Sequence, residues 1–213
     1  ILNRRSFTKY LTKPVDLKLI AEILNVAIYA PSSGNMQNWN VVVVTDEQKI
    51  KELAIASLNQ LWMFQAPVHL VICDKKSDMK RMFGDRADLY GIQNCAALAQ
   101  NILLLATEAD LASCWVGTFD KEAVSRIIKA SSNEEPEIII TLGYSNDKPK
   151  STRYPIDKVC SFNEIGNRSI SFGLFPLEKH KAKVDKIKSF AKEESKGFLT
   201  KLKKGFKKEL ILF

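Results

Sequence analysis

Between a helical pattern and an apolar run, the chain reads Ala30-Pro31-Ser32-Ser33-Gly34-Asn35-Met36-Gln37-Asn38-Trp39-Asn40. This segment places hydroxyls, carboxamides and a glycine in a short connection between two buried elements. Its side chains can make directed hydrogen bonds to a planar, polar heterocycle, and Gly34 allows backbone to approach a ligand closely. An ordinary turn rich in Asn, Gly and Ser is the alternative interpretation of the same residues.

The residues around this segment predict helices and strands in alternation. Helices are expected over 17–29, 46–58, 87–109 and 120–130, and strands over 41–45, 68–73, 113–116 and 137–142. Asp16, Asp46 and Asp120 stand where helix N-caps belong. The charged segment 75–86 is expected to form a mobile loop or a short helix. Such alternation favours a sheet sandwiched by helices.

The net positive charge of the chain comes entirely from its C-terminal part. The 213 residues carry a net charge of +8, and residues 179–213 hold twelve Lys against four Asp or Glu, which accounts for all of it. Residues 1–178, expected to be one domain, are therefore neutral overall. A body without excess positive charge argues against nucleic acid as the main partner.

The cysteines and histidines favour neither a metal site nor a hydrolytic triad. The spacing of Cys73, Cys95, Cys114 and Cys160 fits no zinc or iron–sulfur pattern, and apolar neighbours around the first three are typical of reduced core thiols in a cytoplasmic protein. The only histidines are His69, which falls within a predicted strand, and His180. We expect His69 to be a hydrogen-bonded core residue.

Three further segments carry polar or basic groups suited to a ligand. Arg4-Arg5-Ser6 combines two cations with a hydroxyl and suits a phosphate, with a solvated chain end as the alternative. Ser113-Cys114-Trp115-Val116-Gly117-Thr118 ends a strand in glycine ahead of a helix, where backbone amides become available, unless it is a plain turn. Leu142-Gly143-Tyr144-Ser145 ends the last strand, and Lys150 and Arg153 follow it.

Together these segments resemble the flavin-dependent nitroreductase family over about residues 1–165. The family pattern R-[RH]-S matches residues 4–6, A-P-S-x-x-N-x-Q-x-W matches residues 30–39, W-[IV]-G matches residues 115–117, and L-G-Y matches residues 142–144. Arg153 matches a basic residue that precedes a proline. No single motif is specific, but the set is.

The resemblance implies an α+β, three-layer fold in which helices flank a central mixed or antiparallel sheet. It also implies an intertwined homodimer with two FMN sites, each drawing residues from both subunits. The activity implied is ping-pong hydride transfer from NADH or NADPH through FMN to nitroaromatic, quinone or similar planar acceptors. No side chain is assigned as a catalytic acid or base, because the flavin carries the chemistry.

The resemblance also implies roles for individual residues. Arg4, Arg5, Ser6 and Arg153, with Lys150, are expected at the FMN phosphate. The turn residues Ser32, Asn35 and Gln37 are expected at the phosphoribityl chain and the ring. Trp115, Val116 and Gly117 are expected along the ring, where they place a backbone donor near its reactive edge.

The chain departs from the family pattern at two positions. Asn38 stands where the family usually has proline, which leaves an N–H and a looser backbone at this point. Ser151 stands where many members carry Lys or Arg, and Lys150 is the nearest substitute. A substrate-covering segment is expected within residues 60–93, whose aromatic and Met side chains could stack on a planar substrate or serve only as packing.

The C-terminal tail and the activity both leave alternatives open. Residues 198–213 place Phe and Leu opposite Lys at helical spacing, which predicts a basic amphipathic helix. Four partners compete for this helix: in order of preference, a second subunit, an anionic membrane surface, another protein and nucleic acid. A reductive dehalogenase or another flavin oxidoreductase on the same scaffold, or a non-enzymatic flavin-binding module localised by this tail, would also fit the sequence.

Overall fold

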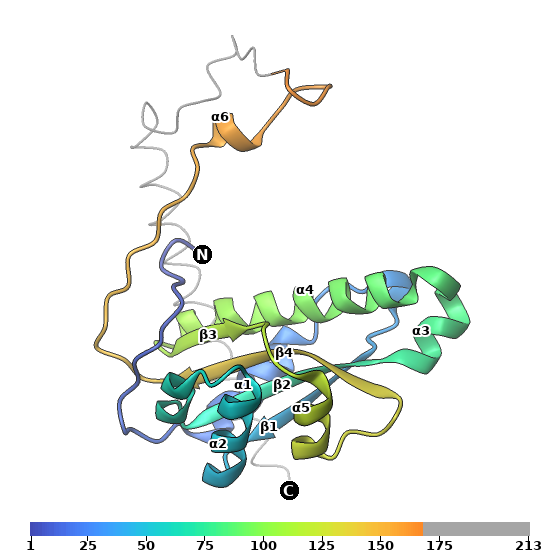
Figure 1. The fold of residues 1–213 in the computed structure, drawn as a ribbon. Coiled ribbons are helices and arrows are strands. Elements are labelled where there is room, and N and C mark those ends of the chain that lie inside the picture. The colour runs from blue at the N-terminus through green and yellow to red at the C-terminus, as the bar shows by residue number, and fades with distance from the viewer. Residues whose placement is uncertain (168–213) are drawn as a thin grey trace, which may run out of the picture. The chain divides into compact units, whose positions relative to one another are not determined.

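The computed structural model describes residues 1–167 of the chain. The chain divides into two units, Ile1–Ser151 and Thr152–Phe213. The first contains the sheet and the helices that cover it (Figure 1). The described part of the second contains one short helix, α6 (Ile156–Val159). The predicted boundary after residue 178 and the amphipathic tail helix lie outside the described residues.

The sheet consists of β1 (Trp39–Val44), β2 (Val68–Lys75), β4 (Glu134–Gly143) and β3 (Ala112–Val116), in that order across it. All neighbouring strands are antiparallel. In the register of β1 with β2, Trp39 pairs with Asp74, which places the start of β1 beside the end of β2. The predicted α+β class and antiparallel sheet are confirmed.

The helices follow the sequence pattern closely. In chain order they are α1 (Leu17–Ala27), η1 (Ser33–Asn35), α2 (Glu47–Ala56), η2 (Leu61–Gln65), α3 (Lys76–Phe83), η3 (Gly84–Arg86), α4 (Ala87–Glu108) and α5 (Lys121–Ile128), where η marks a 3-10 helix. Asp16, Asp46 and Asp120 are N-caps, and each carboxylate accepts a hydrogen bond from a backbone N–H of the first turn. The segment predicted as a loop or short helix is α3 with η3.

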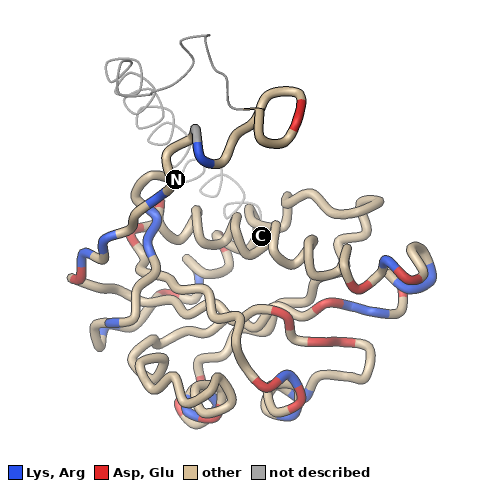
Figure 2. Tube along the Cα trace, turned by 45° about the horizontal axis from the view of Figure 1, so that its top comes forward, with Lys and Arg blue, Asp and Glu red and all other residues tan. Residues whose placement is uncertain are grey.

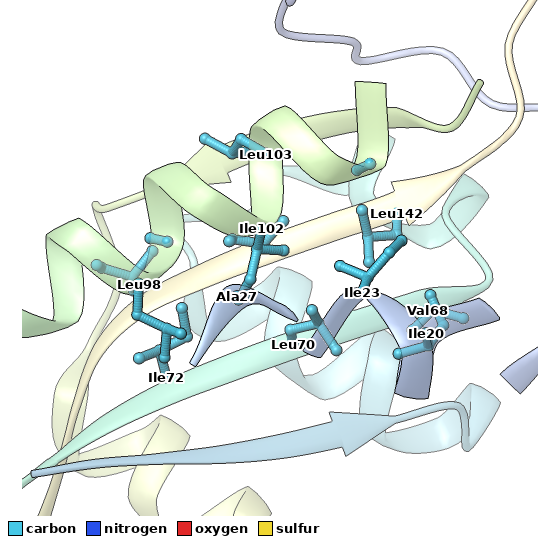
Figure 3. Packing of buried hydrophobic residues seen from close by; sticks show 14 of the residues in the cluster. Ile20, Ile23, Ala27, Val68, Leu70, Ile72, Leu98, Ile102, Leu103 and Leu142 are labelled. Atoms are coloured by element: carbon cyan, nitrogen blue, oxygen red, sulfur yellow. The ribbon is translucent and has the colours of Figure 1, made fainter. Parts of the chain in front are cut away.

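Alternate residues of the central strands face two different helix layers. On one face, Leu70, Ile72 and Ile140 pack with α1 and α4. On the other face, Val71 and Ile139 pack with α2 and α5. Figure 3 shows the first layer, where Ile23 of α1 and Leu98 and Ile102 of α4 lie over β2. The predicted three-layer arrangement is therefore confirmed.

Helix α4 is the long central helix of the first layer. It carries only two charged residues, Asp88 and Glu108, and is drawn almost entirely uncharged in Figure 2. Among the described residues, the helical stretch Lys76–Glu108 alone has the length and hydropathy of a membrane span, and 44% of its most apolar window is buried within the fold. Its composition is also that of a core helix, which the packing of Leu98 and Ile102 shows it to be.

Candidate functional site

The turn between α1 and β1 holds the backbone in a left-handed conformation at three positions. The φ angles are 58° at Gly34, 55° at Asn35 and 46° at Gln37, of which the last two are unusual for residues with side chains. Within the turn, the Asn35 N–H donates to Ser32 O at 2.9 Å and the Gln37 N–H donates to Ser32 Oγ at 3.0 Å. The Asn35 and Gln37 side chains are exposed, so their carboxamides can reach a ligand.

A buried line of polar side chains lies behind this turn. The Ser33 N–H donates to Asn94 Oδ1 at 2.9 Å, and Asn94 Nδ2 donates to Asn38 Oδ1 at 2.6 Å. Asn38 Nδ2 in turn donates to Asp74 Oδ1, and Asp74 Oδ2 lies 3.0 Å from Lys76 Nζ. Sequence reasoning missed Asn94, Asp74 and Lys76, and noted Asn38 only as the missing proline.

Lys76, at the end of this line away from the turn, is surrounded by carboxylates. Besides Asp74, its Nζ lies 3.1 Å from Glu137, 3.3 Å from Glu135 and 3.4 Å from Asp88. Burial alone would lower the pKa of Lys76, but hydrogen bonds and charge attraction from Asp74 and Glu137 raise it above its ordinary value. Lys76 therefore carries its charge throughout the physiological range.

The N-terminal cluster lies beside the last strand of the sheet. Ser6 forms a parallel bridge with Ser113 of β3, and the Phe7 N–H donates to Ser113 O at 3.0 Å. Arg4 and Arg5 are half-buried, and within residues 1–167 neither guanidinium forms an ion pair. Arg5 Nη1 donates to Leu2 O at 2.7 Å and to Arg4 O at 2.8 Å, which holds the segment in shape. Half-buried cations without carboxylate partners are suited to binding an anion.

The end of β3 offers backbone rather than side chains, except at Trp115. Val116 is buried in the core between the sheet and α2 and α5, so a ligand could meet only its backbone. Trp115 is 38% exposed, and its Nε1 lies 3.2 Å from where a Cβ on Gly117 would stand. Glycine at 117 therefore keeps this approach to the Trp115 indole open.

The remaining predicted site residues lie after β4. Lys150 is exposed in the segment that follows the strand. Arg153 belongs to the second unit, where its Nη1 donates to Thr152 O at 2.7 Å.

Within the first unit of one chain, the predicted site residues form two separate groups, one beside β3 and one at the turn before β1. Ser6 joins β3 at one edge of the sheet, whereas the turn of Ser32–Gln37 leads into β1 at the other edge. Adjacent strands are about 4.8 Å apart, so three intervals separate these edges by roughly 14 Å. The turn is also tied to Asn94 near the start of α4, whereas β3 follows the end of that helix.

Within the segment predicted to cover the substrate, some side chains pack in the core and others lie near the turn of Ser32–Gln37. Met79 is fully buried and Trp62 packs against the core, so both are structural. Phe83 borders the turn, because a Cβ on Gly34 would lie 3.2 Å from its Cζ, and its ring meets Tyr90 edge-to-face at 5.1 Å. Of the aromatic side chains of this segment, Phe83 lies next to the turn, and Tyr90 contacts Phe83.

His69 is a buried core residue, as predicted, and the thiols of Cys73, Cys95 and Cys114 are buried. His69 is buried in β2, its Nε2 lies 3.1 Å from Met63 O, and burial lowers its pKa to about 4. Cys73, Cys95, Cys114 and Cys160 are free thiols. No group of three or more His, Cys, Asp or Glu within residues 1–167 could hold a metal ion.

Comparison with known families identifies the fold and the motifs together. A family model described as the nitroreductase family matches residues 1–62 and 55–144. The chain belongs to the nitroreductase family. A relative from Thermus thermophilus named NADH dehydrogenase is 30% identical over 187 residues, covering 74% of this chain and 91% of its own length. A Vibrio harveyi protein named NADPH-flavin oxidoreductase is 26% identical, covering 77% of this chain and 72% of its own length.

A solved structure of this family has the same fold. The NADPH:FMN oxidoreductase from Vibrio harveyi, complexed with NAD+, superimposes with a TM-score of 0.70 at 23% identity, and the match covers 89% of this chain and 83% of that one. The nitroreductase fold predicted from the motifs is thus confirmed. The binding roles of individual residues remain predictions, for which the two groups described above provide the geometry.

The residues of both groups fit FMN chemically. FMN carries a phosphate, a polyol chain and a planar ring with donors and acceptors along its edge. The half-buried guanidiniums of Arg4 and Arg5, which form no ion pair among the described residues, suit the phosphate. The exposed carboxamides of Asn35 and Gln37 suit the polar edge of a heterocycle, because each can donate and accept.

Proposed function

We propose that this chain oxidises NADH or NADPH and reduces small planar acceptors, such as nitroaromatics or quinones, in a ping-pong cycle at an FMN site built from two copies of the chain. The proposal rests on two features together: half-buried arginines that have no carboxylate partner within residues 1–167, and a turn held in a left-handed conformation. The first suits a phosphate and the second presents carboxamides outward.

The broader activity follows from the family. The chain is an NAD(P)H-dependent flavin oxidoreductase, with FMN as its cofactor. FMN bound at this site would supply the hydride-transfer chemistry between the nicotinamide and the acceptor, while the protein would supply position and electrostatics.

The proposal assigns the residues as binding and orienting groups. Arg4, Arg5 and Ser6 hold the phosphate, joined by Lys150 and Arg153. Ser32, Asn35 and Gln37 orient the ring and the chain attached to it. Trp115, Val116 and Gly117 border the ring, and backbone N–H groups there stabilise negative charge on it. Val116 contributes backbone alone, because its side chain is buried in the core.

The separation of the two groups supports the homodimer implied by the resemblance. One chain presents Arg4 and the turn at Ser32 at opposite edges of its sheet, so a second copy brings a turn to the arginines of the first. Helix α4 provides a surface for that contact, because its outer face is uncharged between Asp88 and Glu108 and exposes Leu89 and Ile92.

The aromatic side chains beside the turn support planar acceptors. Phe83 borders Gly34 and meets Tyr90 edge-to-face, and Met82, the residue before Phe83, is 60% exposed. Such groups stack on flat rings and are tolerant of their substituents. A set of nitroaromatic and quinone acceptors is therefore the appropriate first screen.

Steady-state kinetics test this proposal. Initial rates with NADH and NADPH, measured separately against varied quinone or nitroaromatic acceptor, should give parallel double-reciprocal lines. Intersecting lines would contradict the ping-pong cycle. Turnover confined to haloaromatic acceptors would favour the dehalogenase alternative, and flavin binding without any turnover would favour a non-enzymatic module.

The location and the tail enter the proposal as expectations from the sequence. Free thiols at all four cysteines support a reducing, cytoplasmic environment. A membrane or protein partner for residues 179–213 would be lost on truncation after residue 178, without loss of turnover. Dissociation of the dimer on that truncation would instead favour an arm that packs on the partner subunit.

A further inference from the structure

We propose that Asp74, through Asn38 and Asn94, positions the turn of Ser32–Gln37 for the flavin. These three side chains are positioning residues, since none of them is exposed to a ligand. Asp74 is 0% exposed, and Asn38 and Asn94 are each 3% exposed. The inference rests on the proposed function, in which this turn contacts FMN.

The ion pair at one end gives the line its direction. Asp74 Oδ2 pairs with Lys76 Nζ, so the ionised carboxylate offers only acceptors to its other neighbour. Asn38 must then present its Nδ2 to Asp74 and its Oδ1 to Asn94. Asn94 must in turn present its Nδ2 to Asn38, which leaves its Oδ1 for the N–H of Ser33. The charge of Asp74 therefore fixes which atom of Asn94 faces the turn.

The far end of the line is the backbone of the proposed flavin-binding turn. Asn94 Oδ1 accepts from the Ser33 N–H at 2.9 Å and from the Ser33 Oγ at 3.2 Å. Directly after Ser33, the backbone enters the left-handed region at Gly34 and Asn35. A conformation of this kind persists only when surrounding contacts over-determine it. The bond to Asn94 is such a contact, and it comes from a different element, α4.

The line also accounts for asparagine at position 38. Proline, which the family usually has there, stiffens the backbone but has no side-chain donor or acceptor. Asn38 instead links α4 to β2 through its side chain, because its Oδ1 accepts from Asn94 and its Nδ2 donates to Asp74. In this chain a directed set of hydrogen bonds therefore replaces the rigidity of proline.

Exchanging the charge tests the direction of the line. In Asp74→Asn, the new carboxamide best offers its oxygen to Lys76 and its Nδ2 to Asn38. This choice reverses Asn38 and then Asn94, so that an Nδ2 rather than an Oδ1 faces the N–H of Ser33. The double variant D74N/N94D restores an acceptor there, because a carboxylate at 94 accepts from both Ser33 and the reversed Asn38.

The experiment measures the turn without flavin and then with it. Hydrogen–deuterium exchange of the Ser33 amide in the full-length apoprotein should be about 5- to 10-fold faster in D74N than in wild type, and the Kd for FMN should rise by a similar factor. D74N/N94D should bring both back to within about twofold of wild type. N101A is the matched control, because Asn101 of α4 donates to Ala27 O at 3.2 Å, outside the line, and should leave both values unchanged.

A second variant keeps the proposal testable if D74N does not fold. N94A leaves the Asp74–Lys76 pair in place and removes the acceptor for Ser33 together with the donor to Asn38 Oδ1. It should therefore accelerate exchange at Ser33 as D74N does. Unchanged exchange at Ser33 in D74N or in N94A, or no recovery in D74N/N94D, would overturn the proposal. If wild type fails to bind FMN, the proposed function fails, whereas the exchange data still decide whether the line holds the turn.

Discussion

Replacing Gly91 with alanine should destabilise this protein, against the usual effect of that exchange in a helix. Gly91 is buried in α4 and faces the Asp74 side chain of β2. A Cβ at position 91 would lie 2.6 Å from Asp74 Cγ and 2.9 Å from its Oδ1. Because non-bonded carbon atoms settle at about 3.5–4 Å, the helix and the carboxylate must separate by about 1 Å.

The Asp74 carboxylate has nowhere to move without losing a partner. One oxygen accepts from Asn38 and the other lies 3.0 Å from Lys76 Nζ. Disrupting a buried pair of this kind costs about 3–5 kcal/mol, and replacing a helix glycine returns about 1 kcal/mol. We therefore expect G91A to lower the free energy of unfolding by about 2–4 kcal/mol, which corresponds to roughly 4–16 °C in Tm.

A double-mutant cycle with D74A isolates this clash. Urea unfolding followed by tryptophan fluorescence would give the free energy for wild type, both single variants and the pair. In the D74A background the methyl group has space, so G91A should be neutral or stabilising by up to about 1 kcal/mol. A G91A variant as stable as wild type, or an equal cost in both backgrounds, would refute the packing argument.

Three further predictions concern the core and the proposed phosphate site. Because the pKa of His69 falls from 6.5 to about 4 on folding, the unfolded chain binds more protons between these values, and stability should fall by about 3 kcal/mol from pH 7 to pH 4. Urea midpoints at both pH values should show this loss in wild type and not in H69L, and parallel losses in the two would contradict it. R4A and R5A should each weaken FMN binding roughly 10- to 100-fold in a flavin fluorescence titration, since each removes a charge-assisted hydrogen bond, and unchanged affinity would remove that arginine from the site. I102A should lower the free energy of unfolding by about 2–5 kcal/mol, because Ile102 is 0% exposed between α4 and the sheet, whereas a loss under 1 kcal/mol would mean that the site collapses around the cavity.

Local signals predicted the helices and strands well. The N-caps at Asp16, Asp46 and Asp120 depend on residues within three positions, so the sequence alone located the helix starts. The ends of the strands were harder to predict from the sequence. β4 begins at Glu134 rather than at 137, and it includes Pro136 because the pairing with β2 is irregular between Ile72 and Cys73.

The support behind the turn could not be predicted, because it depends on tertiary pairing. Asn38 meets Asp74 from 36 positions away and Asn94 from 56 positions away. Only the register that places Trp39 opposite Asp74 brings these residues together. The polar residues that face outward, by contrast, form motifs that are contiguous in the sequence and could be recognised there.

The absorbance spectrum of the purified full-length protein, with identification of the flavin released on denaturation, tests the central claim most directly. If the chain binds FMN as proposed, the protein should show a flavin spectrum and about one FMN per chain, restored by added FMN if the cofactor is lost in purification. A colourless protein that fails to bind added FMN would contradict the proposed site at Arg4, Arg5 and the Ser32–Gln37 turn.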